Sequence, residues 1–176
     1  MKNEYNSCYI KLSETQPEHI RKLMISLVGE KSKEKLYNNL KDLEEIYPDF
    51  ENWFYSKVIP ELELKNGQRE IIVVISEDKN TKKSVLSGIA ILKKTIDQKK
   101  ICTFRVHKDY RNQGIGTLLF KACFEYLETE MPVISISEKI LDEFESHIKK
   151  FHFELTTIHD SYYKNGIKEY VYNGSL

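Results

Sequence analysis

The sequence predicts an α/β fold of the mixed (α+β) kind, and three observations support this prediction. The segment Ile71–Ile75 is β-branched throughout, which is typical of a strand buried on both faces. An amphipathic stretch over 114–129 separates two short apolar runs, so we expect a strand–helix–strand step with one parallel strand pair. The chain has 176 residues, 40% of them hydrophobic and 31% charged, which suffices for one globular core. We expect residues 1–176 to form a single domain.

The first third of the chain is predicted to be one short strand followed by helices. A short run of mixed apolar and polar residues over 8–12 indicates the strand, and apolar residues at helical spacing over 20–28 indicate the first helix. A second helical face covers 36–47, and a dense aromatic cluster over 50–59 precedes Pro60. We expect this cluster to pack on the sheet, although it could also form a wall of an acceptor pocket.

The remaining two thirds of the chain alternate strands with two further helices. The strand over 71–75 is expected to lie centrally in the sheet, with 85–92 as its antiparallel hairpin partner. The other predicted elements are a strand over 101–106, a helix over 114–129, a strand over 133–137, a helix over 140–151, and a closing hairpin of 153–158 with 168–172 around Asn165-Gly166.

Composition and charge exclude several classes of protein. Lys and Arg number 27 and Asp and Glu number 27, so the zero net charge argues against a nucleic-acid partner. The longest apolar run is Ile71–Ile75, whereas a membrane span needs about 18 residues. The polar N-terminus lacks the apolar core of a signal peptide, and we therefore expect a cytoplasmic protein without a membrane partner.

The three cysteines, Cys8, Cys102 and Cys123, are odd in number and widely spaced. No CxxC pair occurs, so neither a disulfide framework nor a metal site is indicated. We expect all three to be small buried side chains.

The segment Val106–Thr117 contains the residues that predict a ligand-binding site. Gly114 and Gly116 lie where the helix over 114–129 is predicted to begin. A helix start offers unpaired backbone N–H groups and the positive end of the helix dipole, and glycines let a ligand approach the backbone closely. The segment is therefore predicted to hold a pyrophosphate.

The two common nucleotide loops do not fit this segment. A Walker loop requires a Lys after its last glycine, but Thr117 follows Gly116. A dinucleotide fingerprint requires a small residue three positions after the second glycine, where Leu119 stands.

The run Arg111-Asn112-Gln113-Gly114-Ile115-Gly116 resembles the signature Arg/Gln-x-x-Gly-x-Gly/Ala of the GNAT superfamily of N-acetyltransferases. The preceding turn is also similar, although Lys108 replaces a proline that is common in the family. The resemblance implies a mostly antiparallel central sheet that is splayed at one parallel strand pair, with helices on both faces. It also implies acetyl-CoA as the donor and direct attack of a primary amine on the thioester.

By this resemblance, the pyrophosphate would be held by backbone amides at the helix start and by the Thr117 hydroxyl, while β-strand backbone would receive the pantetheine arm. One of the paired lysines near predicted turns, such as Lys149-Lys150, could reach the ligand's ribose phosphate, although most such pairs are solvated. The implied donor-binding residues are Phe104, Val106, Arg111, Asn112, Gln113, Gly114, Ile115, Gly116 and Thr117.

The family's proton-donating tyrosine has no counterpart at its usual place, where this chain has Ile148. The replacement candidates are Tyr163, Tyr162 and Glu138, with His147 and Ser137 as further alternatives. Each also has a structural interpretation: the tyrosines as packing residues, His147 as a surface residue, and Glu138 as a carboxylate that complements a helix dipole.

Three functions therefore stay open at the level of sequence. The first is N-acetylation of an amine of a small molecule or a protein. The second, suggested by Ile148, is a non-catalytic acyl-CoA-binding module, and the third is acetylation of an aminoacyl-tRNA. A homodimer is also open, because an exposed sheet edge and the aromatic cluster over 50–55 could both serve as contacts.

Overall fold

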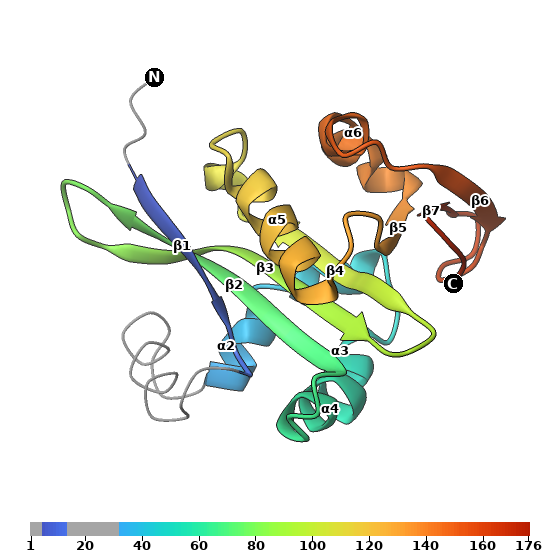
Figure 1. The fold of residues 1–176 in the computed structure, drawn as a ribbon, viewed down its shortest axis with the longest axis horizontal. Helices are drawn as coiled ribbons and strands as arrows, with labels where there is room; N and C mark the ends of the chain where they lie inside the picture. Colours follow the sequence, from blue (N-terminus) through green and yellow to red (C-terminus); the bar gives the residue numbers. More distant parts are fainter. Residues whose placement is uncertain (1–4, 14–31) are drawn as a thin grey trace.

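The computed structural model describes residues 5–13 and 32–176, which form a seven-stranded sheet with helices on both faces (Figure 1). The strand order is β1-β2-β3-β4-β5-β7-β6. The strands are β1 Tyr5–Lys11, β2 Arg69–Asp78, β3 Ser84–Lys94, β4 Lys99–Val106, β5 Val133–Ser137, β6 Leu155–Asp160 and β7 Lys168–Tyr172. The helices are α2 Ser32–Asn38, α3 Phe50–Trp53, α4 Ile59–Glu63, α5 Ile115–Leu127 and α6 Leu141–Lys150, with short helical turns η1 Lys41–Glu45, η2 Phe54–Val58, η3 Lys108–Tyr110 and η4 Glu138–Ile140.

The sheet is antiparallel at every strand pair except β4–β5. That parallel pair is short, because only Lys100↔Val133 and Ile101↔Ile134 are in register. Beyond Ile101 the two strands diverge, and the edge of β4 from Cys102 to Val106 has no strand partner on that side. The mixed sheet with a splayed parallel pair is thus confirmed.

Helix α5 covers one face of the sheet, and α2 to α4 cover the other (Figure 1). The strand β2 separates these layers, since Ile72 and Val74 face α5 while Ile71 and Val73 face α3 and α4. The prediction that this segment is buried on both faces is confirmed. Its expected central position is only partly right, because β2 is the second strand from an edge of the sheet.

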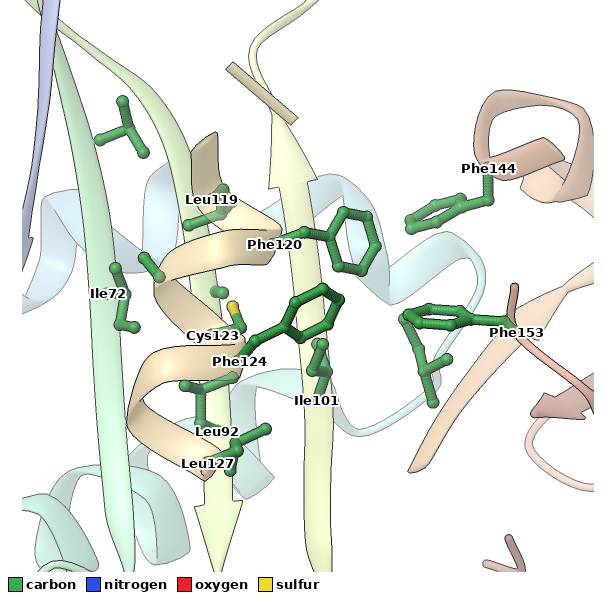
Figure 2. Packing of buried hydrophobic residues seen from close by; sticks show 14 of the residues in the cluster. Ile72, Leu92, Ile101, Leu119, Phe120, Cys123, Phe124, Leu127, Phe144 and Phe153 are labelled. Carbon is green, nitrogen blue, oxygen red and sulfur yellow. The ribbon is translucent and has the colours of Figure 1, made fainter. Parts of the chain in front are cut away.

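Aromatic rings hold the two halves of the sheet together where strand pairing is missing. Figure 2 shows Phe120 and Phe124 projecting from α5 towards Phe144 of α6 and Phe153. The centroid of the Phe120 ring lies 5.7 Å from that of Phe153 and 6.5 Å from that of Phe144. Phe120 also stacks on Phe104 of β4 at 4.0 Å. Burial of these rings substitutes for the backbone hydrogen bonds that the splay leaves out.

The helical region before β2 departs from the prediction in two ways. The helix predicted over 36–47 is broken between α2 and η1, where Asn38 and Asn39 are poor helix formers. The helix beginning at Phe50 instead continues past Pro60 into α4. The π-helical turn η2 immediately before Pro60 accommodates the proline, because it interrupts the regular hydrogen-bond ladder. The helix predicted over 20–28 lies outside the described residues.

The aromatic cluster over 50–59 packs on the sheet, as expected, with Phe50, Phe54 and Val58 buried against β2 and β3. The expectation for the cysteines is wrong for two of the three. Only Cys123 is buried, whereas Cys8 is exposed on the edge strand β1 and Cys102 is partly exposed. The longest helix described, α5, has 13 residues, and none of the helices within 5–13 and 32–176 could serve as a membrane span.

Candidate active site

The start of α5 presents unpaired backbone amides. Gly114 caps the helix in the left-handed region at φ 86°, a conformation that glycine adopts without strain. The first hydrogen bond of the helix runs from Leu118 N–H to the Gly114 carbonyl at 3.0 Å. The amides of residues 115–117 precede this bond and lie at the positive end of the helix dipole. This geometry suits a phosphate, as the sequence predicts.

Gly116 is required for a different reason, namely the close approach of α6. A Cβ atom at this position would lie 2.7 Å from Nε2 of His147. The His147 ring packs on Phe120 with centroids 5.2 Å apart. Burial, and then the nearby Lys150 ammonium, lower the pKa of His147, which favours the neutral imidazole.

Two cations lie beside this helix start. Lys150 Nζ donates to Thr117 Oγ1 at 3.1 Å, so one of the paired lysines lies beside this helix start. Arg111 Nη1 donates to Glu143 Oε1 at 2.8 Å, an ion pair in which both side chains are about half exposed. Gln113 Nε2 donates to the Asp109 carbonyl at 3.0 Å. This side chain therefore stabilises the turn before the helix.

A cavity of about 630 Å³ opens between the unpaired edge of β4 and α6. Gly116 and His147 lie at one side of it, and residues of η1 close the opposite side. Among the predicted donor-binding residues, Phe104, Val106, Arg111, Asn112 and Gly116 line this cavity. We call it the donor cavity.

A small void of about 30 Å³ lies at the splay and shares Leu43, Phe104, Ile140 and Phe144 with the donor cavity. We call this void the passage. Cys102 lies in its wall at a β-bulge, where the β3–β4 register shifts from Leu92↔Ile101 to Ile91↔Thr103. Bulges often end strand pairing and redirect a side chain beside an active site.

A second cavity of about 340 Å³ shares Tyr47, Cys102 and Ser135 with the passage. We call this the acceptor cavity. Its walls are the aromatic rings of Tyr47, Phe50, Trp53 and Tyr163, together with basic side chains from the sheet. The aromatic segment over 50–59 thus both packs on the sheet and supplies one wall of a cavity.

A buried carboxylate lies behind the acceptor cavity. Glu169 of β7 is 1% exposed, and burial raises its pKa to about 7 even though the Lys100 ammonium opposes the shift. Interaction with the hydroxyl of its cross-strand partner Ser137 also lowers this pKa, although neither Glu169 Oε2 nor Ser137 Oγ forms a hydrogen bond of normal geometry within the described residues. A carboxylate with this pKa exchanges a proton near neutral pH.

Two lining tyrosines interact with this carboxylate. Burial, and then the Glu169 charge, raise the pKa of Tyr47. Burial raises the pKa of Tyr163 to about 12, with a smaller contribution from Glu169. The two rings meet edge to face with centroids 5.1 Å apart. Both hydroxyls therefore stay protonated at neutral pH.

The structure separates the candidates that sequence reasoning grouped together. Tyr163 lines the acceptor cavity, whereas Tyr162 is 50% exposed and packs on Tyr163. Glu138 is exposed and accepts a hydrogen bond from the Lys168 amide at 3.1 Å, which favours its structural interpretation. Ile148 packs into the core on the donor side.

Sequence reasoning missed Glu169, Tyr47 and Lys100. A signal for Glu169 was present, because strict alternation in β7 places it on the same face as the buried Val171. An acidic residue at an inward position of a strand is rare unless it is paired or functional. Tyr47 had no comparable signal, since it lies between helical segments.

A family model described as an acetyltransferase (GNAT) domain matches residues 68–166, more than half of the chain. The chain belongs to the GNAT acetyltransferase family. Family membership makes it an acyltransferase of the N-acetyltransferase type, and the matched segment contains both β4 and the α5 start. No curated protein matches the sequence.

Solved GNAT structures share the fold at low identity. The NatC complex bound to a Gag peptide and CoA aligns with TM-score 0.59 and 11% identity, covering 95% of this chain and 96% of that chain. A GNAT acetyltransferase from Bacillus cereus aligns with TM-score 0.53 and 15% identity, covering 96% of this chain and 94% of that chain. A Bacillus anthracis acetyltransferase named for streptothricin, in complex with acetyl coenzyme A, aligns with TM-score 0.50 and 16% identity, covering 63% of this chain and 65% of that chain. These structural similarities support the assignment of the GNAT fold.

Proposed function

We propose that this GNAT protein transfers an acetyl group from acetyl-CoA to a primary amine by direct attack, with both substrates bound at once. The observation that carries this proposal is the pair of cavities at the splayed strands, each of which shares wall residues with the small void at Cys102. A thioester entering from one side and an amine entering from the other would meet at the passage. Such positioning supplies much of the rate enhancement in a two-substrate reaction.

The donor side is suited to a pyrophosphate and an extended pantetheine arm. The amides of residues 115–117, the Thr117 hydroxyl and the Lys150 ammonium would bind the phosphates. The unpaired backbone of β4 from Cys102 to Val106 would hydrogen-bond the arm as an added strand does. The chain's own residues thus orient the thioester towards the passage.

The acceptor side supplies the proton transfers. The amine nitrogen bonds to the thioester carbon, the carbon–sulfur bond breaks, and the proton released by nitrogen passes through a lining hydroxyl to Glu169. A tyrosine hydroxyl, from Tyr163 or Tyr47, protonates the departing thiolate, and the tyrosinate then takes back the proton held by Glu169. Glu169 suits the role of proton acceptor because its pKa of about 7 lies near the working pH.

Calorimetric titration with acetyl-CoA and with CoA, followed by thiol release against a panel of amines, tests the proposal. We expect binding and amine-dependent thiol release, both lost in Gly114→Glu, which places a charged side chain at a φ of 86° beside the phosphates. Binding without release for any amine would instead support the non-catalytic module. Release only with aminoacyl-tRNA would support the third function considered from sequence.

A further inference from the structure

Three basic side chains stand in one row across the sheet beside the acceptor cavity. Arg69 of β2 pairs directly with Lys93 of β3, and Lys93 pairs directly with Lys100 of β4. Residues directly opposite one another on antiparallel strands share a face of the sheet. All three line the acceptor cavity, so the cavity has a floor of adjacent cations.

Such a row is costly to the fold, because like charges directly opposite one another destabilise a sheet. Arg69 forms an ion pair with Glu61 on α4, whose carboxylate accepts from Arg69 Nε at 2.8 Å. Lys93 Nζ donates to the neutral amide oxygen of Gln98 at 3.2 Å. Within residues 5–13 and 32–176, neither Lys93 nor Lys100 forms a salt bridge.

Several neighbours shift the pKa of Lys100. Burial lowers its pKa, the charges of Lys93 and Arg69 lower it further, and Glu169 and Cys102 act in the opposite direction. Glu169 and Lys100 attract one another, because each shifts the pKa of the other towards its charged form, but they form no salt bridge and Glu169 leaves the charge of Lys93 unpaired among the described residues. The remaining acidic side chain in the cavity wall, Asp49, is exposed and accepts a hydrogen bond from Asn52 at 3.0 Å.

The row lies close to the passage along β4. Cys102, in the passage wall, is two residues beyond Lys100, a backbone separation of at most about 7 Å because Cys102 lies in a bulge. The amine that attacks the thioester must lie at the passage, whereas an anionic group bound by Lys93 and Lys100 would lie towards the row. The aromatic rings of Phe50, Trp53 and Tyr163 would contact the body between the two groups.

We propose that the acceptor is an amine that also carries a carboxylate, which Lys93 and Lys100 bind while the amine faces the passage at Cys102. This inference rests on the proposed function and narrows it to zwitterionic acceptors of about dipeptide length, whose two termini lie about 7 Å apart. Polycationic amines are disfavoured because the same row repels them.

The test compares two matched acceptors, the dipeptide Gly-Phe and its C-terminal amide, with spermidine as a polycation. We expect the wild-type kcat/KM to be at least about tenfold higher for Gly-Phe than for the amide, and lower still for spermidine. Lys93→Met and Lys100→Met should raise KM for Gly-Phe about tenfold or more while leaving KM for the amide and for acetyl-CoA unchanged. Lys99→Met, a neighbour on β4 whose Nζ donates to the Glu128 carbonyl, should keep the preference.

Calorimetric binding of Gly-Phe in the presence of CoA gives a readout that does not depend on turnover. Equal binding of acid and amide by the wild type, or equal effects of the lysine variants on both, would overturn the inference while leaving the proposed function intact. Binding of Gly-Phe that depends on Lys93 and Lys100, without turnover of any amine, would support the anion site and overturn the proposed function. Misfolding of the variants is checked by thermal unfolding, where relief of the like-charge row should leave the melting temperature unchanged or raised.

Discussion

Replacing Glu169 by glutamine should stabilise the protein at alkaline pH and impair its activity. The wild-type carboxyl has a pKa of about 7 in the folded state, against an ordinary value of 4.5. The folded state therefore holds this proton more tightly than the unfolded state does. The stability contributed by the protonated carboxyl is fully present below pH 4.5 and is lost as the pH rises through about 7.

The size of this loss follows from the interval between the two pKa values, which corresponds to about 3 kcal/mol when complete. Between pH 5 and pH 8 the difference in unfolding free energy between Glu169→Gln and wild type should shift by about 2 to 3 kcal/mol in favour of the variant. Urea unfolding of both proteins at several pH values, monitored by circular dichroism, measures this shift. Comparison with the variant cancels the contributions of other titrating groups.

The same variant tests the catalytic assignment. The wild-type kcat/KM should fall as the pH drops below about 7, because Glu169 becomes protonated and can no longer accept the proton from the amine. Glu169→Gln should lower kcat by about 10²-fold or more and remove this pH dependence. Glu138→Gln, which removes an exposed carboxylate near the end of β5, should retain kcat. A pH-independent stability difference, or an unchanged pH–rate profile in Glu169→Gln, would refute the reasoning.

Three further predictions concern single side chains. Gly116→Ala should displace the partly exposed His147 ring, whose Nε2 atom would lie 2.7 Å from the new Cβ, so we expect a cost of about 1 kcal/mol in urea unfolding that adding His147→Ala removes. Phe120→Ala should cost about 3–5 kcal/mol of unfolding free energy, measured in urea, because this fully buried ring bridges the splay; a cost below about 1 kcal/mol would show that other contacts hold the two halves together. Tyr163→Phe should lower kcat with little change in KM, and an additional loss in a Tyr47→Phe double variant would show that both hydroxyls donate.

Local sequence patterns were sufficient for most of the fold and for the position of the α5 start. The β-branched run of β2, the glycines of the α5 start and the apolar face of α5 each reflect interactions between residues close in the chain. Backbone conformation and amphipathic burial depend on neighbours of this kind, so their signals survive in the sequence alone. The family motif is likewise contiguous, which is why the helix start could be located residue by residue.

The acceptor side, in contrast, was decided by tertiary structure. Tyr47, Cys102, Tyr163 and Glu169 come from distant segments and meet only because β5 and β7 lie beside the splayed end of β4. The row of Arg69, Lys93 and Lys100 depends on strand register, which no single segment specifies. The raised pKa of Glu169 arises from burial beneath these elements, so its chemistry did not exist until they packed together.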